Sequence, residues 1–551
     1  MKAPATTQKL RGGYYTPESI ANFLAQWAIH PGTTSVLEPS CGDGNILAAA
    51  VNVIQQLGLQ EIEILGIEID DIEAQKTITR LTQLTSSSAV QIHNGDFFTC
   101  AQERLLWQHQ YDAIIGNPPF IRYQNFQEEH RAIAFSIMQH AGLHPTRLTN
   151  AWVPFLVTST LLLKRGGRIA MVIPAELLQV NYAAELRRFL TDYYSKITLF
   201  TFKKLVFADI QQEVVLFLGE RDGNEHTGIR AIELHDIAEL RQYQHTHFPV
   251  NGLKAMDHST EKWTQYFLEQ PEIDILRRLR SDDRVMRANN VIDVDVGMVT
   301  GLNEFFILTE QQAQEAGLTA YTKPIVTRSG HLQGIKFTVD DFTTNLAKQF
   351  PALILTAPNL PFEELPENVK KYIAYGEQQK FHIGYKCRIR ERWYIVPSLW
   401  TPDAFMLRQV HHYPKLILNQ TEATSTDTIH RVRFVSTLPR KMITAAFLNS
   451  LTFAFAEVMG RSYGGGVLEL EPNEAEALPI PLNNAEALDF ELIHTLVAQG
   501  KIEAVLDITD QVLLIDGLGL TRCEVTSLRT AWCKLRDRRV NRKHQKVTNG
   551  T

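Results

Sequence analysis

The fold is decided by the stretch Val36-Leu37-Glu38-Pro39-Ser40-Cys41-Gly42-Asp43-Gly44-Asn45. It places an acidic residue at the end of a short β-branched run, and a tight turn follows. The glycines of such a turn let a ligand approach the backbone. A glycine pair alone is weak support for a binding site, because many strand-to-helix turns contain one. The neighbouring segments therefore decide what this turn does.

Four short apolar runs around this turn are separated by helical patterns; they cover residues 35–38, 62–69, 111–115 and 167–173. Continuous apolar strands of this kind predict a mostly parallel sheet that is buried on both faces. We therefore expect a doubly wound, Rossmann-like α/β domain, with its ligand at the carboxyl ends of the strands.

Two further segments follow the glycine turn in the order that a nucleoside site requires. Glu68 ends the next strand about 20 residues after the turn, which is the position from which such a fold binds ribose hydroxyls. In Asn94-Gly95-Asp96-Phe97-Phe98, the Asp96 carboxylate can accept from an adenine amino group and an aromatic ring can lie against the base. Each feature alone is weak, but together they predict a nucleoside-binding pocket.

The most informative segment is Asp112-Ala113-Ile114-Ile115-Gly116-Asn117-Pro118-Pro119-Phe120. Two prolines directly after a buried strand keep the Pro118 carbonyl out of a helical ladder. If that carbonyl and the Asn117 side-chain oxygen accept both hydrogens of an exocyclic amine, its lone pair can be presented to a methyl sulfonium. Phe120 would then stack on a base that has been rotated out of the duplex. The segment predicts methylation of an amino group.

The chain is 551 residues long, so two or more domains are expected. Its five cysteines lack the spacing of a disulfide framework or a metal site, and no apolar run is long enough to cross a bilayer. These features predict a cytoplasmic protein without a metal centre. The net charge is -6, yet residues 381–441 hold ten Lys and Arg against four acids, and residues 529–546 hold eight against one. Basic charge in two C-terminal stretches is compatible with nucleic-acid binding.

In their order along the chain and in their residues, these elements resemble the gamma-class N6-adenine DNA methyltransferases of bacterial restriction-modification systems. The resemblance extends to Gly13-Tyr14-Tyr15-Thr16-Pro17 ahead of the glycine turn and to Val206-Phe207 beyond the later strands. It implies S-adenosyl-L-methionine as cofactor, with Thr16, Glu38 and Ser40 at its methionine portion. The full set of cofactor residues implied is Thr16, Glu38, Ser40, Cys41, Gly42, Glu68, Asp96, Phe97 and Pro119.

The same resemblance implies that Asn117, Pro118, Pro119 and Phe120 are catalytic, and that Phe120 and Phe207 stack on the two faces of the flipped adenine. The partner implied is double-stranded DNA, methylated within a short recognition sequence to protect it from a cognate restriction endonuclease that acts as a separate protein. We expect a monomer.

The expected architecture is a class I methyltransferase domain over residues 1–245, a mixed α/β target-recognition domain over 246–483, and a helical segment with a basic tail over 484–551. The recognition domain contains several segments that resemble the same family, including residues 296–303, 388–394, 418–420 and 430–432 and Gly464-Gly465-Gly466 with Glu469. Within it, Arg388, Arg390 and Arg392 are interleaved with aromatic residues and are the expected DNA contacts.

Several other functions remain open at this point. The Asn-Pro-Pro-aromatic motif also occurs in enzymes that methylate protein glutamine or guanine N2 of ribosomal RNA, and N4-cytosine methylation is a further alternative. A non-catalytic DNA-binding specificity subunit is another possibility, although an intact motif together with Glu38, Glu68 and Asp96 argues against it. Cytosine C5 methylation is excluded because none of the cysteines follows a proline, as that family requires.

Overall fold

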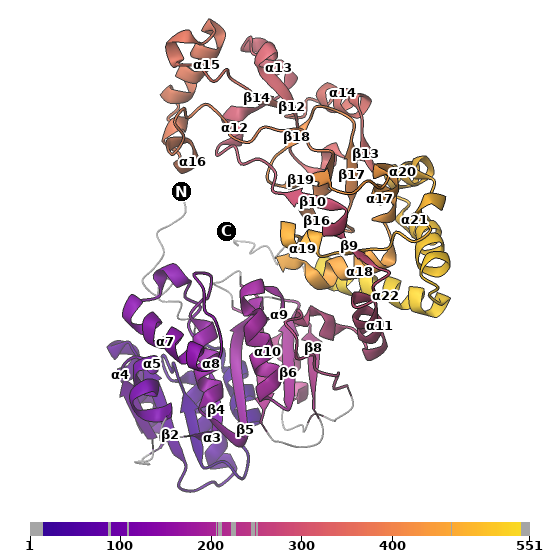
Figure 1. The fold of residues 1–551 in the computed structure, drawn as a ribbon. Helices are drawn as coiled ribbons and strands as arrows, with labels where there is room; N and C mark the ends of the chain where they lie inside the picture. The colour runs from indigo at the N-terminus through magenta and orange to yellow at the C-terminus, as the bar shows by residue number, and fades with distance from the viewer. Residues whose placement is uncertain are drawn as a thin grey trace. The chain divides into compact units, whose positions relative to one another are not determined.

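The structure is a computed structural model that describes residues 15–85, 90–106, 110–204, 206–207, 212–221, 227–243, 248, 252–463 and 466–541. Gly13, Tyr14, Gly464, Gly465 and the basic tail after Asn541 lie outside the described residues. The chain divides into two compact units, one ending at Gln270 and the other spanning Pro271–Val540. Figure 1 shows both units as ribbons.

The first unit is built on an eight-stranded sheet in the order β3-β2-β1-β4-β5-β7-β6-β8. Its strands are β1 (Ser35–Glu38), β2 (Glu63–Glu68), β3 (Val90–Asn94), β4 (Tyr111–Gly116), β5 (Leu163–Pro174), β6 (Lys196–Phe202), β7 (Val214–Glu220) and β8 (Gly228–Leu234). Strands β1 to β5 run parallel to one another, whereas β7 runs antiparallel to both β5 and β6. The predicted mostly parallel α/β sheet is therefore confirmed, and the sequence pattern left the direction of β7 undetermined.

Helices cover both faces of this sheet, with α7, α8 and α10 in front of it in Figure 1 and α3 behind it. The helices are α2 (Glu18–Ala28), α3 (Asn45–Gln56), α4 (Asp71–Leu84), α5 (Phe97–Cys100), α7 (Glu128–His140), α8 (Trp152–Leu161), α9 (Glu176–Gln179) and α10 (Ala184–Tyr193). Alternate strand residues such as Val36, Ala113 and Ala170 join one core with α2 and α3. The continuous apolar runs in the sequence reflect this burial on both faces.

At the amino ends of the central strands, one carboxylate joins three of them. Asp112 accepts from Thr34, Ser35 and Lys164 over 2.6 to 3.0 Å, and Lys164 also donates to the Ser35 hydroxyl over 3.2 Å. Burial opposes ionisation of Asp112, but these hydrogen bonds outweigh it and lower its pKa to about 2. The charged carboxylate thus fixes the starts of the strands, at the end of the sheet opposite to the predicted ligand site.

The boundary between the units lies after Gln270, whereas the change in sequence pattern pointed to residue 245. Residues beyond 245 remain attached to the first unit, because Lys254 forms a β-bridge with Ile229 and the buried Arg187 donates to the carbonyls of Thr260 and Glu261. These are single long-range contacts, which leave no periodic pattern in the sequence.

The second unit contains several small sheets instead of one large sheet. The largest has the strand order β10-β19-β15-β17-β13, and the next has the order β11-β14-β12-β18. The strands are β9 (Met286–Arg287), β10 (Ile292–Asp295), β11 (Ile307–Leu308), β12 (Thr322–Val326), β13 (Lys336–Phe337), β14 (Leu353–Leu355), β15 (Ala404–Leu407), β16 (Gln409–Val410), β17 (Leu416–Asn419), β18 (Thr424–Ser425), β19 (Ile429–Phe434), β20 (Arg461–Tyr463), β21 (Val467–Glu469) and β22 (Pro479–Ile480).

Helices surround these sheets and form the end of the described chain. They are α11 (Gln270–Arg280), α12 (Asn303–Phe306), α13 (Glu310–Glu315), α14 (Val339–Ala347), α15 (Glu367–Gln378), α16 (Tyr385–Arg388), α17 (Arg440–Ala446), α18 (Ser450–Met459), α19 (Pro472–Glu476), α20 (Phe490–Ala498), α21 (Ile502–Thr509) and α22 (Arg522–Val540). The expected mixed α/β region and helical C-terminal segment are both present, and they form one compact unit. Among the described residues no single helix is long and apolar enough to span a membrane, and α17 with α18, which would suffice together, are bent by 70°.

The last helix, α22, carries most of the described part of the basic tail, and several of its cations pair with acids. Arg529 bonds to Asp507 and Asp510, and Arg539 forms a buried ion pair of 2.6 Å with Glu457 on α18. Lys534 bonds to Glu272 on α11, and Arg278 on α11 bonds to Glu524. The described part of this basic stretch therefore packs against its own unit.

Breaking the buried pair should destabilise the second unit strongly. Glu457 and Arg539 each expose 3% of their side chains, so Glu457→Gln leaves a buried guanidinium without its counter-charge. We expect the free energy of unfolding of the unit to fall by about 3 to 5 kcal/mol, measured by urea denaturation. Arg522→Ala changes an exposed cation of the same helix and should alter that free energy by less than about 0.5 kcal/mol. Equal effects would mean that the pair contributes no more than a surface charge.

Candidate active site

The glycine turn after β1 adopts the backbone geometry that its sequence predicts. Gly42 and Gly44 have φ values of 52° and 80°, in the left-handed region that favours glycine. A Cβ at Gly44 would lie 2.9 Å from the side chain of Thr77, whose hydroxyl donates to the Gly42 carbonyl over 2.6 Å. Arg80 pairs with Asp43 at 3.1 Å. The turn is therefore held from α4 as well as from β1.

Glu68 links this turn to the next strand. Its Oε2 accepts from the Gly42 amide over 2.8 Å, and its Oε1 accepts from the Asp70 amide over 2.9 Å. Its carbonyl accepts from the Asn94 side chain and the Gly95 amide. The carboxylate predicted to bind a ribose is thus held in a fixed orientation beside the glycine turn and the end of β3.

Three predicted residues that are far apart in sequence meet at Asn117. The Asn117 side-chain Nδ2 donates to the Thr16 hydroxyl over 3.1 Å, and the Ser40 hydroxyl donates to the Asn117 carbonyl over 3.3 Å. The first bond turns the amide so that Oδ1 faces away from Thr16. Asn117 is therefore joined to the segment before α2 and to the glycine turn.

Glu38 is a buried carboxylate beside this junction. It is 1% exposed, and its Oε2 has no hydrogen-bond partner among the described residues. Burial and the nearby charges of Asp43 and Glu68 raise its pKa well above the ordinary value. An unpaired buried carboxylate fits a cationic ligand group such as the ammonium of an amino acid, which is the portion of S-adenosylmethionine expected there.

Asp96 and the aromatic residues take different positions. Asp96 caps α5 by accepting from the Thr99 amide over 2.9 Å, and its other oxygen lies 3.6 Å from His130. Phe97 is 2% exposed and its ring stacks on Phe155 at 5.2 Å, so it has little surface to offer a ligand. The ring expected against the cofactor thus packs in the core, and its contact with the cofactor stays a prediction.

Phe120 and Phe207, the two expected base-stacking rings, belong to the same hydrophobic cluster. Phe120 is half-buried and packs against the edge of this cluster, whereas Phe207 is 6% exposed. Pro118 is buried, Pro119 is half-buried, and neither lies in a helix. The half-buried Phe120 therefore has more ring surface accessible to a base than Phe207 has.

Ile69 is a candidate that the sequence analysis missed. It directly follows Glu68 at the carboxyl end of β2 and is 54% exposed, although the residues before it alternate into the core. An apolar side chain left exposed beside the carboxylate predicted to bind ribose can lie against a nucleobase. The signal was an isoleucine between two carboxylates, Glu68 and Asp70.

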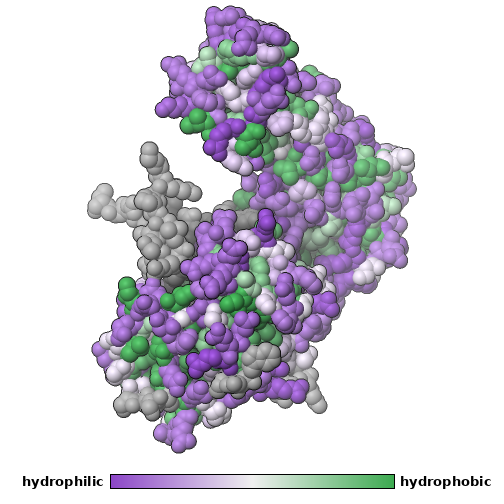
Figure 2. Space-filling view, turned by 60° about the vertical axis from the view of Figure 1, so that its left-hand side comes forward, coloured by the Kyte–Doolittle hydropathy of each residue, from purple (hydrophilic) through white to green (hydrophobic). Residues whose placement is uncertain are grey.

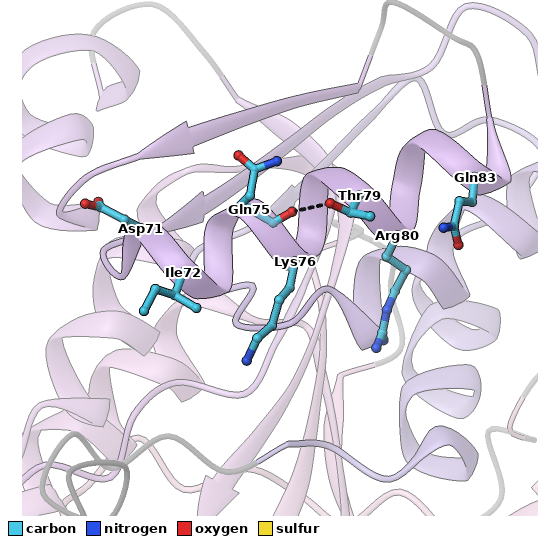
Figure 3. Close-up of a pocket in the computed structure, with 7 residues that line it drawn as sticks. All are labelled: Asp71, Ile72, Gln75, Lys76, Thr79, Arg80 and Gln83. Atoms are coloured by element: carbon cyan, nitrogen blue, oxygen red, sulfur yellow. Dashed lines mark hydrogen bonds between the residues drawn. The ribbon is translucent and has the colours of Figure 1, made fainter.

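A hollow of about 620 Å³ lies on α4 and does not coincide with these residues. Figure 3 shows its lining on one helix, with Lys76 and Arg80 projecting from the same side. The described lining is Asp71, Ile72, Gln75, Lys76, Thr79, Arg80 and Gln83. Lys76 pairs with Glu73 and Arg80 pairs with Asp43, so both cations already have acidic partners.

The three arginines expected to bind DNA differ in their surroundings. Arg388 is exposed, whereas Arg390 donates to the carbonyls of Val299 and Thr300 over 3.1 and 2.7 Å. Arg392 is half-buried and donates to Asn359 over 2.6 Å. Arg390 therefore holds the 296–303 segment in place, and Arg388 is the most accessible of the three.

Comparison with known proteins follows the division into units. Residues 1–290, more than half of the chain, match the family model described as N-6 DNA Methylase, and residues 260–514 match that of the type II methyltransferase M.Eco57I, C-terminal domain. The type II methyltransferase M.AccI of Acinetobacter calcoaceticus is 23% identical over 495 residues, covering 87% of this chain and 86% of the relative. M.XamI of Xanthomonas campestris pv. amaranthicola is also 23% identical, over 86% of each chain.

A solved structure shares the fold over most of the chain. The type IIL restriction-modification enzyme MmeI, in complex with DNA, has a TM-score of 0.52 and 13% identity, covering 98% of this chain and 72% of that one. The class I methyltransferase fold followed by a mixed α/β region, expected from the sequence, is confirmed.

The buried Glu38 should leave a signature in the pH dependence of stability. Because its pKa is raised by folding, the native state keeps its proton to higher pH than the unfolded chain does. The wild type should therefore lose stability relative to Glu38→Gln as pH rises above about 4.5, and the difference between the two should become constant below that pH. Urea denaturation of both proteins at a series of pH values tests this. A difference that does not change with pH would contradict the assignment.

Proposed function

We propose that this chain, which belongs to the N-6 DNA methylase family, transfers a methyl group from S-adenosylmethionine to the N6 amino group of adenine in a specific double-stranded DNA sequence. The observation that carries the proposal is the junction at Asn117, where the Thr16 hydroxyl and Ser40 meet the side chain and backbone of the Asn-Pro-Pro-Phe segment. It connects the predicted cofactor residues to the predicted catalytic residue through direct hydrogen bonds.

The cofactor supplies an electrophilic methyl group on a sulfonium centre. Around it, Glu38 would neutralise the ammonium group, Glu68 would accept from the ribose hydroxyls and Asp96 from the adenine amino group. Phe97 would line the adenine site, as the sequence predicts, and the exposed Ile69 would lie against the adenine face. Thr16, Ser40, Cys41, Gly42 and Pro119 complete the proposed pocket.

The chemical step needs two acceptors aimed at one amine. We propose that Asn117 Oδ1 and the Pro118 carbonyl accept the two N6 hydrogens, so that the nitrogen lone pair points at the methyl group. Donation from Asn117 Nδ2 to Thr16 supports this role, because it orients the amide before the base arrives. Phe120 and Phe207 would hold the extruded base between their rings.

The second unit would select the DNA sequence. Its match to the C-terminal domain of a type II methyltransferase supports this division of labour. We propose that the chain acts as a monomer and that its cognate endonuclease is a separate protein.

The proposed reaction can be tested in cells. Genomic DNA from cells that express the full chain is sequenced with detection of modified bases, and cells expressing Asn117→Ala serve as the reference. We expect N6-methyladenine within one short sequence in the first sample and not in the second. Methylation at cytosine N4, or no modified base, would overturn the proposal.

The role of Asn117 predicts a separation of catalysis from cofactor binding. Asn117→Ala should bind S-adenosylmethionine normally but lose about 100-fold or more in turnover, because an oriented acceptor at the reacting nitrogen is removed. Thr16→Val, which removes the orienting hydroxyl, should lower turnover by about tenfold. Calorimetry and single-turnover methylation measure the two quantities. Asn52→Ala, on the exposed side of α3, is the matched control. If Asn117→Ala lost no more turnover than Asn52→Ala does, the proposed catalytic role of Asn117 would be contradicted.

Arg388 and Arg390 should respond differently to removal. Arg388→Ala should weaken DNA binding and flatten the logarithmic dependence of affinity on salt by about 0.9, the effect of one lost phosphate contact. Arg390→Ala should instead lower the melting temperature, since it releases the carbonyls of Val299 and Thr300. Lys501→Ala, which removes one exposed cation elsewhere in the unit, is the control and should leave the salt dependence unchanged. An unchanged salt slope in Arg388→Ala would assign that side chain to another role.

A further inference from the structure

One short segment of the second unit exposes three large apolar side chains. Ile383, Tyr385 and Ile389 are 60%, 65% and 60% exposed, all within seven residues. Tyr385 and Ile389 are four residues apart around the one-turn helix α16, so their side chains lie on the same face. Figure 2 shows hydrophobic residues interrupting the hydrophilic surface at the height that α15 and α16 occupy in Figure 1. Apolar side chains gathered in this way mark a binding surface.

The segment that carries these side chains is packed against the core of the second unit. Cys387, between the exposed residues, is 1% exposed and belongs to the core of Phe305 and Phe306. A Cβ at Gly301 would lie 2.7 Å from Lys386 Cβ, so the two backbones approach closely. Arg390 bonds to the same 296–303 segment. The exposed side chains are therefore presented on a preformed base and need little ordering when they bind.

The charge around these side chains identifies the partner. Residues 380–392 contain five Lys and Arg against one acid. Lys386 and Arg388, which flank Tyr385 and Ile389, are exposed, and among the described residues no acid pairs with either. The cations of α22, in contrast, bond to Asp507, Glu272 and Glu457. Unneutralised cations beside apolar side chains fit a polyanion that also has apolar surfaces to bury, and stacked bases between phosphates meet both requirements.

We propose that Tyr385 and Ile389 enter the DNA duplex and separate two neighbouring bases, while Lys386 and Arg388 hold the adjoining phosphates. The inference rests on the proposed function, in which a base must leave the stack. Apolar side chains inserted between base steps unstack them and kink the duplex, which lowers the additional cost of extruding a base nearby. Ile383 would cover the edge of the opened step.

The test compares two variants of the full chain on two duplexes that carry the mapped methylation sequence. In one duplex the target adenine is paired, and in the other it faces a mismatched base that already weakens the stack. Tyr385→Ala/Ile389→Ala should lose about tenfold or more in affinity for the paired duplex and much less for the mismatched one. Lys386→Ala/Arg388→Ala should lose affinity for both duplexes alike and show a flatter salt dependence.

Val339→Ala/Leu492→Ala removes two other exposed apolar residues of the same unit and should bind both duplexes as the wild type does. Equal losses on the two duplexes by the Tyr385 and Ile389 variant, or none, would overturn insertion. Insertion would also be overturned if the wild type sedimented as a dimer, Tyr385→Ala/Ile389→Ala sedimented as a monomer, and both bound DNA equally. That result would assign the surface to a second copy of the chain. Failure of the proposed function would show differently, as absence of any methylated base in DNA treated with the wild type.

Discussion

The candidate site depends on the parallel pairing of β1 with both of its neighbours. Glu38 lies opposite Gly66 on β2, and Leu37 lies opposite Ile114 on β4. Parallel strands end at the same edge of a sheet, so this register gathers the residues that follow β1, β2 and β4 within hydrogen-bonding reach of one another. Asp112 secures the opposite ends of the strands with a fully ionised carboxylate. A shift of one residue in any of these strands would point each buried side chain at the opposite face of the sheet and separate Ser40 from Asn117.

Much of the first unit could be predicted from the sequence because its signals are local. The run at residues 35–38 corresponds to β1, and the runs at 62–69 and 111–115 lie within two residues of β2 and β4. The hydrogen bond that orients the Asn117 side chain could not be predicted, because its acceptor, the Thr16 hydroxyl, is 101 residues away and the contact depends on side-chain direction. The packing of Phe97 on Phe155 could not be predicted either, since an aromatic residue beside a carboxylate gives no sign of which way it points. Phe155, which covers it, comes from a distant helix.

Charge was the least predictable property. The sequence shows two basic stretches, but the cations of α22 in the second one bond to acids that come from α11, α18 and α21. Such pairing depends on tertiary packing, and a count of residues along the chain cannot detect it. The charge of residues 380–392 differs because a single acid accompanies five cations. A local excess of charge therefore becomes informative only when the partners of each side chain are known.

The two bonds between α11 and α22 have a consequence for how the second unit can be moved. Lys534 with Glu272 and Arg278 with Glu524 join the first and the last helix of the unit, so both of its ends lie together. A module whose entry and exit are adjacent can be exchanged between scaffolds without stretching either junction. Replacement from α11 to α22 as one cassette would retain these bonds, whereas a graft that stops before α22 would discard them together with the partner of Glu457. Recombination between related enzymes should therefore succeed at junctions outside this pair of helices.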